Sequence, residues 1–402
     1  MVNIIGLGYI GLPTALMLAA HGVSVVGTDY SEQVVAQLRA KQLTFEEAGL
    51  EALFAKAVDA GISFTTAYQE TDTYIIAVAT PYEEENKKVD ASYVVAAIKQ
   101  VLQVCPKGAV IIIESTVSPG TIDRYVRPLL AAQGLVAGED IHLVHAPERI
   151  IPGNMLYELI HNSRTIGADS AEIAQRVRDL YASFCKGEIV LTDIRTAEMT
   201  KVIENTFRAV NIAFANELAK LCSEEGMDVY EIIRICNMHP RVNILSPGPG
   251  VGGHCIPVDP WFLVGDYKEK TPLIAQAMQV NQSMPDFVFR RICAVMQAQG
   301  IADFSRVGLY GLTYKANVDD VRESPTLQLL ARHSEAFAVF DPMVSRDIVE
   351  NQYHDFEAFL EKTDLIVIMV DHKHLKKHMN SLDAKAVLDL RCVYNGENVY
   401  HL

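Results

Sequence analysis

A single cysteine in a loop of glycines and prolines is the feature of this 402-residue chain that is best suited to chemistry. Residues 246–255 read Ser-Pro-Gly-Pro-Gly-Val-Gly-Gly-His-Cys, and Asp259 follows Cys255 by four residues. Because glycines let the backbone approach a ligand closely, we expect this loop to present the Cys255 thiol to a substrate. Most free cysteines are buried as small hydrophobes, and we interpret the other six cysteines of the chain in that way.

A second group of residues is typical of a site for a dinucleotide. Gly6, Gly8 and Gly11 form the pattern G-x-G-x-x-G after an apolar strand, and a helical pattern over residues 12–20 leads to a second strand that ends at Asp29. The glycines admit a pyrophosphate to the helix N-terminus, where N–H groups and the dipole favour an anion. Asp29 would bind the ribose hydroxyls and repel a 2′-phosphate, which predicts NAD rather than NADP. A tight turn with no ligand would leave the agreement of these four features unexplained.

Three further polar residues follow apolar runs that read as buried parallel strands. Thr80, Thr116 and Glu148 each come directly after such a run. Ligands of an open α/β sheet bind beyond the carboxyl ends of its strands, so we expect Thr116 and Glu148 near a ligand. Each could instead be a helix N-cap or a solvated loop residue, and for Thr116 both interpretations stay open.

A long helix is expected over about residues 196–225, which contain neither proline nor glycine. Its apolar residues lie on several sides, which predicts a buried helix that joins two domains and packs against a partner subunit. Lys201 and Asn205 are four residues apart and share one face of it. A buried lysine is costly unless it is paired. The alternative is an exposed Lys201 in a salt bridge with Glu198 or Glu204.

The alternation of strands and helices resumes after about residue 300 and predicts a second Rossmann-like half that lacks G-x-G-x-x-G. The expected strands are residues 306–310, 336–340, 365–370 and 386–390. Lys315 and Arg322 lie on the loop after the first strand and are candidates for phosphate contacts. The alternative is that Asp319 and Asp320 balance both cations on the surface.

Composition limits the class of protein. The net charge of −15 argues against general nucleic-acid binding. The seven cysteines show no C-x-x-C spacing, so we expect no zinc site, no other metal site and no disulfide framework, and a reducing cytoplasm fits best. The N-terminus lacks a signal-peptide pattern, and the apolar runs are far shorter than the ~20 residues that span a bilayer. We therefore expect a soluble protein without membrane or nucleic-acid partners.

A thiol beside a dinucleotide predicts an oxidation through a covalent sulfur adduct. The thiol adds to an aldehyde to form a thiohemiacetal, loss of a hydride gives a thioester, and water releases an acid. The thiol must be partly ionised, and Lys201 and His254 are its candidate cationic neighbours. Hydrolysis needs a carboxylate base for water and donors for the developing oxyanion.

The chain resembles the UDP-glucose/GDP-mannose dehydrogenase family over its whole length. The resemblance rests on these motifs: residues 6–13 (Gly-x-Gly-Tyr-Ile-Gly-Leu-Pro), 114–121 (Glu-Ser-Thr-Val-Ser-Pro-Gly-Thr), Pro147-Glu148, Lys201 with Asn205, residues 250–259, and Lys315 with Arg322. It implies two doubly wound Rossmann-like domains joined by a long central helix. The implied limits are 1–195 for the NAD-binding domain, 196–295 for the central domain and 296–402 for the UDP-sugar-binding domain. The family oxidises a primary C6 alcohol to a carboxylate with two NAD per turnover, and a homodimer is implied.

The resemblance also implies roles for individual residues. The implied catalytic residues are Cys255 as nucleophile, Lys201 and Asn205 at the oxyanion, Asp259 in proton transfer through Lys201 or a water, and Glu148 with Thr116 at the hydrolytic water. The implied NAD contacts are Gly6, Gly8, Tyr9, Ile10, Gly11, Asp29, Thr80, Thr116 and Arg322. The implied substrate contacts are Glu148, Arg149, Lys201, Asn205, Gly252, Lys315 and, from a neighbouring subunit, Arg241.

Within the family, several segments are similar to the members that oxidise UDP-N-acetylmannosamine, among them residues 195–199, 207–218 and 239–245. The UDP-glucose members usually have Ser before the cysteine and a second acidic residue after Pro-Glu. This chain has His254 in the first place and Ile150-Ile151-Pro152-Gly153 in the second. Ala79 departs from the family, which more often has Pro or Gly there. UDP-GlcNAc and UDP-glucose remain alternatives, because the shape of the pocket sets the stereochemistry at C2.

Two other functions compete with this interpretation. A two-electron NAD dehydrogenase of the β-hydroxyacid type shares the two-part layout and a helical lysine, but has no use for Cys255. A non-enzymatic NAD-binding sensor would make the occurrence of Lys201, Glu148, Cys255 and Asp259 a coincidence, and it would be indifferent to Cys255→Ser. The implied product, an acetamido-uronic acid, would suit a bacterial surface polysaccharide such as a capsule.

Overall fold

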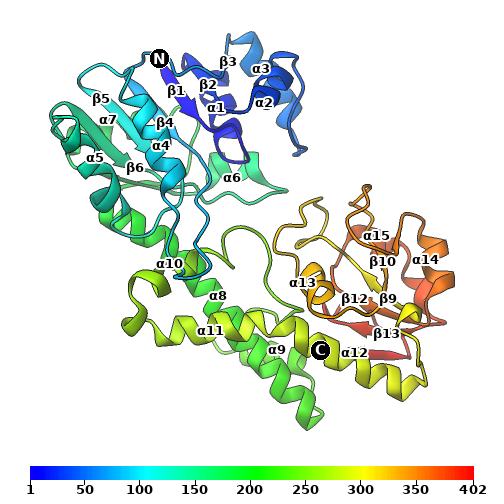
Figure 1. Ribbon diagram of the computed structural model, residues 1–402. Coiled ribbons are helices and arrows are strands. Elements are labelled where there is room, and N and C mark those ends of the chain that lie inside the picture. The colour runs from blue at the N-terminus through cyan, green and yellow to red at the C-terminus, as the bar shows by residue number, and fades with distance from the viewer. The chain divides into compact units, whose positions relative to one another are not determined.

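The computed structural model describes residues 1–402, which divide into two compact units. The N-terminal unit consists of residues 1–204 and 265–267, and the C-terminal unit of residues 205–264 and 268–402. Figure 1 shows a sheet with flanking helices in each unit. None of the helices is both long and apolar enough to cross a membrane.

The N-terminal unit is built on an eight-stranded sheet in the order β3-β2-β1-β4-β5-β6-β7-β8. Its strands are β1 (Val2–Ile5), β2 (Val25–Thr28), β3 (Ser63–Thr65), β4 (Thr73–Ile76), β5 (Ala109–Ile113), β6 (Ile141–His145), β7 (Arg164–Ala168) and β8 (Ile189–Thr192). All neighbouring strands are parallel except β6 and β7. The strand order reverses between β1 and β4, and such a switch point is where doubly wound sheets bind their ligands.

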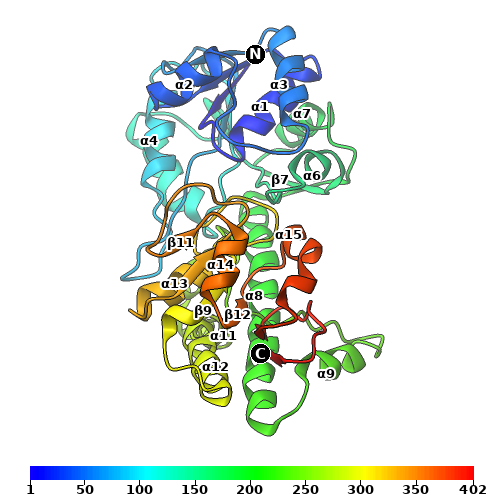
Figure 2. The same ribbon diagram turned by 90° about the vertical axis from the view of Figure 1, so that its right-hand side faces the viewer.

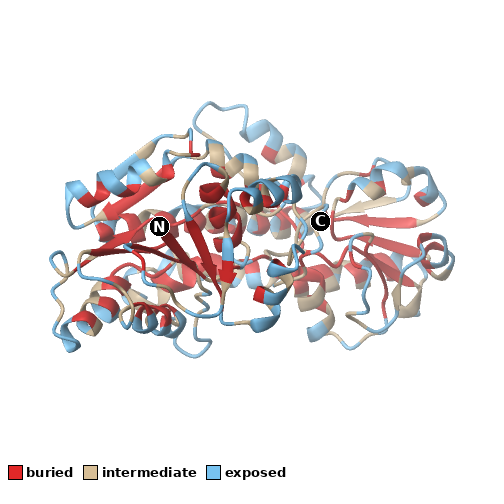
Figure 3. Cartoon of the chain, turned by 90° about the horizontal axis from the view of Figure 1, so that it is seen from above, coloured by how far each residue is buried: buried red, intermediate tan, exposed pale blue.

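Helices cover both faces of this sheet, because its central strands are apolar on both sides. Ile4 packs with α1 (Gly11–Ala20), α3 (Leu50–Asp59), α6 (Met155–His161) and α7 (Ala171–Tyr181), whereas Ile5 packs with α4 (Ser92–Val101) and with the turn and helix α5 (Arg127–Ala132) after β5. The remaining helix of this part is α2 (Glu32–Arg39). Figure 3 shows the strands as the buried layer beneath helices that are exposed on their outer sides. Two-sided burial of parallel strands explains their continuous apolar runs.

The C-terminal unit contains an all-parallel sheet of six strands in the order β11-β10-β9-β12-β13-β14. Its strands are β9 (Val307–Tyr310), β10 (Ala338–Phe340), β11 (Gln352–Tyr353), β12 (Leu365–Ile368), β13 (Ala386–Asp389) and β14 (Val399–His401). Helices α12 (Met284–Gln299) and α13 (Pro325–Arg332) cover one face, and α14 (Phe356–Lys362) and α15 (Lys373–Lys377) the other. The unit also holds α9 (Val229–Cys236), α10 (Asp259–Asp266) in part, and α11 (Pro272–Gln282).

The long helix α8 (Ile194–Glu225) joins the two parts of the chain, and Figure 2 shows its full length. It ends where Gly226 adopts a left-handed conformation with φ of +66°, which suits a helix stop. Ala215, Ala219 and Cys222 pack against α12 in the C-terminal unit. Phe207, Phe214 and Leu221, in contrast, are more than half exposed. These three residues are therefore not buried within a single chain, and the expected packing of this helix against a partner subunit stays a prediction.

The predicted fold class, two doubly wound Rossmann-like halves joined by a long helix, is confirmed. Every strand that the sequence predicts is present, with bounds that differ by a few residues at most. Helix α13 is capped by Ser324, whose hydroxyl accepts a hydrogen bond from the backbone N–H of Leu327, and Pro325 occupies its first turn. The edge strands β3, β8, β11 and β14 were not predicted, and neither was β7, which lies between β6 and β8.

Candidate active site

The three glycines of the dinucleotide motif have different surroundings. Gly6 ends β1 with φ of +92°, and a Cβ added to it would lie 2.6 Å from the carbonyl oxygen of Ala77. A Cβ added to Gly11 would lie 1.9 Å from the carbonyl oxygen of Gly6. A Cβ on Gly8 would meet no atom of the protein within 4 Å. The chain itself thus requires Gly6 and Gly11, whereas Gly8 leaves open space at the helix N-terminus, which fits the pyrophosphate of NAD.

Asp29 ties the end of β2 to this glycine loop. Its Oδ2 accepts a hydrogen bond from the backbone N–H of Leu7 at 2.8 Å, and its Oδ1 accepts one from the N–H of Ser31 at 2.9 Å. Each carboxylate oxygen has a second lone pair, so both can still accept from ribose hydroxyls. Beside the loop, the ring of Tyr9 stacks on Phe45 with centroids 4.4 Å apart. These residues fit NAD, and when bound NAD would supply the acceptor of a hydride.

We expect Asp29→Ala to weaken NAD binding about tenfold or more, because charge-assisted hydrogen bonds contribute roughly 1.5–3 kcal/mol each. The same change removes the negative charge that repels a 2′-phosphate, so the preference for NAD over NADP should shrink. Calorimetric titration with each dinucleotide measures both effects. Glu32→Ala, three residues further on, serves as a control for the loss of an acidic side chain. An unchanged ratio of the two affinities would contradict the role of Asp29.

The remaining predicted contacts of this unit lie on loops at the carboxyl ends of the strands. Ile10 immediately precedes α1, and Thr80 is half-buried in the loop after β4. Thr116 is half-buried after β5, in a segment anchored by a 2.7 Å hydrogen bond from the Ser115 hydroxyl to the carbonyl of Val78. That anchor connects the loops after β4 and β5, as expected for a common ligand edge.

Lys201 is buried on α8, and neither acidic residue considered as its partner pairs with it. Glu198 accepts hydrogen bonds from the backbone N–H groups of Gly120 and Ile122 in the loop after Thr116. Burial raises the pKa of Glu198 to about 7, although these two N–H groups oppose the rise. Glu204 forms an ion pair with Arg149 at 3.0 Å. Lys201 itself is only 5% exposed, so the alternative of an exposed surface lysine is wrong.

Glu148 and Arg149 follow β6 and face two different groups of residues. Glu148 is buried, and its Oε1 accepts a hydrogen bond from the backbone N–H of Arg149 at 2.7 Å. The Arg149 guanidinium donates to the hydroxyl of Thr165 at 2.7 Å and reaches Glu204 on α8. Arg149 therefore links the β6 loop to the first half of α8, the half on which Lys201 lies.

The cysteine loop in the C-terminal unit is held by its own backbone and by α8. The carbonyl of Cys255 accepts hydrogen bonds from the backbone N–H groups of Val258 at 3.1 Å and Asp259 at 2.8 Å, so the thiol stands at a turn that leads directly into α10. Asp259 is buried, and its Oδ2 accepts a hydrogen bond from the Asn205 side-chain amide at 2.6 Å. The fold thus brings together Asn205 and Asp259, two predicted site residues that are 54 positions apart.

The glycines before Cys255 permit close packing on a second loop, residues 311–325. A Cβ on Gly252 would lie 2.6 Å from the carbonyl oxygen of Glu323 and from the Cβ of Tyr314. The backbone N–H of Gly253 donates to the carbonyl of Arg322 at 3.0 Å. The predicted site residues Gly252 and Arg322 therefore lie together, and Lys315 lies on the same loop, so the thiol loop and the predicted phosphate-binding loop form one assembly.

Arg322 also pairs with an acidic residue of its own loop. Its guanidinium donates to both carboxylate oxygens of Asp320, at 2.8 and 2.5 Å. This is the alternative that the sequence left open for Arg322, and its contact with NAD stays a prediction. Arg241 is exposed in the turn after α9, which is compatible with the role predicted for it at a neighbouring subunit.

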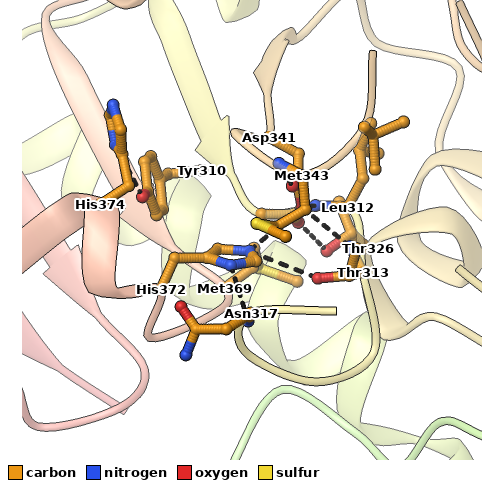
Figure 4. A network of polar contacts seen from close by, with 12 residues as sticks. Tyr310, Leu312, Thr313, Asn317, Thr326, Asp341, Met343, Met369, His372 and His374 are labelled. Carbon is orange, nitrogen blue, oxygen red and sulfur yellow. Dashed lines mark hydrogen bonds and ion pairs between the residues drawn. The ribbon is translucent and has the colours of Figure 1, made fainter. Parts of the chain in front are cut away.

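A buried network fixes the loop that contains Lys315 (Figure 4). Asp341, at the end of β10, accepts hydrogen bonds on Oδ2 from the backbone N–H groups of Leu312 at 2.6 Å and Thr313 at 3.0 Å. His372 lies 3.2 Å from the same oxygen, and its Nδ1 accepts a hydrogen bond from the N–H of Asn317 at 3.1 Å. Burial alone would raise the pKa of Asp341, but the hydrogen bond that His372 donates from Nε2 and those from backbone N–H groups outweigh it, and the pKa is lowered. The carboxylate thus stays ionised and holds the loop.

Asp341 occupies the place in the second half that Asp29 occupies in the first. Gly6 donates its N–H to the carbonyl of Thr28, and Gly311, with φ of +107°, donates in the same way to the carbonyl of Phe340, both at 2.8 Å. The oxygens of Asp341, however, are engaged by three backbone N–H groups, since Met343 donates to Oδ1, and by His372. The second half therefore repeats the architecture of a dinucleotide site but uses its carboxylate to hold its own loop.

Two arginines near these loops were not predicted: Arg164, which is buried, and Arg391, which is half-buried. Arg164 begins β7 and binds the carboxylate of Glu148. Arg391 follows β13 and donates from Nε to the carbonyl of Met369 at 2.7 Å, and its Nη1 would lie 2.8 Å from a Cβ added to Gly248 in the cysteine loop. The sequence could have indicated Arg391 as a residue near a ligand, because it follows the carboxyl end of an apolar run.

Comparisons with known proteins agree with these sites. Three domain models of the UDP-glucose/GDP-mannose dehydrogenase family match the chain: the NAD binding domain over residues 1–185, the central domain over residues 195–283 and the UDP binding domain over residues 308–399. The first contains the dinucleotide loop, the second Lys201, Asn205 and the cysteine loop, and the third Lys315 and Arg322.

Individual relatives match over most of the chain. It is 40% identical over 386 residues to the UDP-N-acetyl-D-mannosamine dehydrogenase of Methanococcus maripaludis strain C7, which covers 94% of this chain and 88% of the relative. It is 37% identical to the NDP-N-acetyl-D-galactosaminuronic acid dehydrogenase of Ralstonia nicotianae, with 99% and 97% covered. The structure of the UDP-N-acetyl-mannosamine dehydrogenase Cap5O from Staphylococcus aureus is 39% identical, with a TM-score of 0.88 and 100% and 97% covered. The chain therefore belongs to the UDP-glucose/GDP-mannose dehydrogenase family and is an NAD-dependent oxidoreductase.

Proposed function

We propose that this enzyme oxidises the C6 alcohol of UDP-N-acetyl-D-mannosamine to the carboxylate in two NAD-dependent steps. The observation that carries the proposal is the assembly in the C-terminal unit, where the thiol loop packs on the loop of Lys315 and Arg322 while Asn205 binds Asp259. The relatives at about 40% identity that are named UDP-N-acetyl-D-mannosamine dehydrogenases support the choice of sugar. The similarity to an N-acetylgalactosaminuronic acid enzyme supports a 2-acetamido sugar rather than glucose.

In this proposal the chain's own residues carry out the covalent chemistry. The Cys255 thiolate adds to the C6 aldehyde that the first oxidation produces, which gives a thiohemiacetal. Lys201 and Asn205 stabilise the alkoxide that forms, and Asp259, through Lys201 or a water, supplies the proton that completes the thiohemiacetal and takes it back when the hydride leaves in the second oxidation. The second oxidation turns the adduct into a thioester. Glu148 with Thr116 then directs water onto the thioester carbon, and the bond to sulfur breaks to release the acid and the thiol. When bound, NAD would supply the acceptor for the hydride of each oxidation.

The binding roles follow the same proposal. Lys315, Arg149, Arg241 and Gly252 contact the UDP-sugar, and Arg322 and Thr80 contact NAD. The three-part division into residues 1–195, 196–295 and 296–402 belongs to the proposal, as does a location in the reducing cytoplasm, which the seven free cysteines support. An acetamido-uronic acid product suits the synthesis of a surface polysaccharide such as a capsule.

The number of NADH molecules formed per limiting sugar tests the proposal. Purified protein is incubated with excess NAD and with UDP-N-acetylmannosamine, UDP-GlcNAc or UDP-glucose in parallel. We expect two NADH per UDP-N-acetylmannosamine and little turnover of the other two sugars. One NADH per sugar would contradict the thioester route and favour a two-electron dehydrogenase. Equal or faster turnover of UDP-GlcNAc or UDP-glucose would overturn the choice of sugar but not the chemistry.

We also propose that the enzyme is a homodimer that forms through α8. Phe207, Phe214 and Leu221 are spaced by seven residues, so they form one exposed apolar stripe along the helix. We expect Phe214→Asp to convert the dimer to a monomer, because a charge in an apolar interface must be desolvated without a partner. Light scattering after size-exclusion chromatography measures the mass. Gln100→Asp on the exposed side of α4 is the control, and a monomeric wild type would refute the dimer.

A further inference from the structure

Three charged side chains form a buried cluster in the N-terminal unit, at the carboxyl ends of β5 and β6 and the start of β7. Glu114 follows β5, Glu148 follows β6 and Arg164 begins β7, and each is less than 10% exposed. The Nη1 of Arg164 lies 3.3 Å from Oε1 of Glu114, and its Nη2 donates to Oε2 of Glu148. One guanidinium therefore serves two carboxylates that belong to different strands.

Aromatic residues hold the guanidinium in this orientation. The carbon Cζ of Arg164 lies 4.3 Å from the ring centroid of Tyr181 on α7 and 5.5 Å from that of Phe184. The hydroxyl of Tyr181 donates to the same Glu114 oxygen at 3.2 Å, and the thiol of Cys185 is a further titratable group beside Arg164. Tyr181 thus supports Arg164 from its face and Glu114 from its edge, which leaves the guanidinium little freedom to turn away from Glu148.

Stability is a weak reason for this arrangement. A buried ion pair costs so much desolvation that apolar residues of the same volume often stabilise a fold as well or better. Buried ionised groups are instead frequent where a charge state matters for function. The only member of the cluster that the proposed function uses is Glu148, whose carboxylate must be ionised to take a proton from water.

We infer that Arg164 is a positioning residue that fixes the carboxylate of Glu148 in the orientation needed for hydrolysis of the thioester. This inference rests on the proposed function. The carboxylate of Glu148 is fixed at both oxygens, by the Arg149 backbone N–H on Oε1 and by Arg164 on Oε2. Each oxygen keeps a second lone pair for a water molecule. A guanidinium fork can fix the plane of a carboxylate in a way that a lysine ammonium cannot.

The second carboxylate of the cluster, Glu114, competes little with Glu148 for the positive charge of Arg164. Burial, and after it the charge of Glu148, raises the pKa of Glu114 to about 7, while Arg164 and Tyr181 oppose the rise. In its protonated form Glu114 does not compete for the positive charge. The pairing of Arg164 with Glu148 is then the strongest electrostatic contact of the cluster.

Arg164→Met tests the inference, because Glu148 acts only in the last chemical step. We expect a rapid burst of two NADH per active site, followed by steady-state turnover that is about 100-fold slower than in the wild type, the lower end of the range for a lost general base. The thioester should accumulate on Cys255 and appear in the mass of the intact protein. Arg164→Lys should recover part of the rate.

Controls separate this role from folding and from the proposed function. Arg176→Met changes an exposed arginine of α7 and should leave all phases unchanged. If Arg164→Met does not fold, the Arg164→Lys variant provides the test instead. A folded Arg164→Lys that turns over at the wild-type steady-state rate and accumulates no thioester would overturn the inference. Equal slowing of the burst and of the steady state would overturn it too. If the wild type itself forms fewer than two NADH per sugar, the proposed function fails, whatever the variants show.

Discussion

Replacing Cys255 by alanine is expected to lower kcat roughly 1,000-fold or more, because loss of the nucleophile removes every covalent step at once. Formation of the acid and of the second NADH per sugar should fall to the background rate, because only the first oxidation precedes the bond to sulfur, and the intact protein should show no adduct by mass spectrometry. Cys255→Ser should also fail, since a serine hydroxyl at its usual pKa is a far weaker nucleophile than a thiol. Turnover above a tenth of the wild-type rate in either variant would contradict the covalent mechanism.

The Cys255→Ala substitution should change the reaction rate but not the stability of the fold. The cysteine loop is held by hydrogen bonds to the backbone carbonyl of Cys255 and by the side chains of Asn205 and Asp259, none of which the substitution removes. The melting temperature should therefore change by no more than about 2 °C, as expected for a partly exposed site away from the core. Cys236→Ala, at the exposed end of α9, is the matched control and should keep full activity.

Two alanine substitutions in the glycine loop are expected to have opposite effects on folding and binding. Gly11→Ala places a Cβ 1.9 Å from the carbonyl oxygen of Gly6, so α1 must move away from β1. We expect it to destabilise the N-terminal unit by about 3 kcal/mol, at the upper end of the cost of overpacking. Gly8→Ala meets no protein atom within 4 Å, so its melting temperature should equal that of the wild type.

Gly8→Ala should nevertheless weaken NAD binding by tenfold or more, because its methyl group enters the space that the pyrophosphate needs. Thermal unfolding without ligand and calorimetric titration with NAD measure the two properties separately. A folded Gly8→Ala that binds NAD like the wild type would show that the dinucleotide does not approach the backbone at this glycine. A Gly11→Ala with unchanged stability would show that α1 can shift at little cost.

The sequence predicted those parts of the fold and site that have a local signature. Buried parallel strands such as β4 and β5 show up as continuous apolar runs, and Gly226 marks the end of α8. The edge strand β8 was missed because its apolar run, Ile189-Val190-Leu191, is only three residues long and shows no alternation. Strand β7 was missed because it begins with a buried arginine and contains Gly167, where a Cβ would lie 2.5 Å from the carbonyl oxygen of Asp193.

The residues of the site, too, could be predicted only where they stand in a local sequence pattern. Cys255, Asp29 and the three glycines stand in patterns that a single sequence reveals, whereas the partners of their neighbours depend on tertiary contacts. Arg164 is 16 residues from Glu148 and 50 from Glu114, and nothing in the sequence links the three. The partners of Glu198 could not be predicted either, because its carboxylate turns to a loop 76 residues away. Pairings of this kind arise from the packing of strands and helices, which a local pattern does not contain.

The carboxylate of Asp341 has a consequence for the timing of the reaction. It is engaged in holding its own loop, and the family's NAD binding domain matches the N-terminal half, whereas its UDP binding domain matches the second half. If each sugar is oxidised twice, NADH must dissociate and a second NAD must bind while the aldehyde intermediate stays in the active site. A free aldehyde would diffuse away or react with amines during that interval. The covalent bond to Cys255 would then keep the aldehyde on the enzyme while the cofactor is exchanged. A chain with one NAD-binding domain needs such a bond to carry out two oxidations on the same sugar.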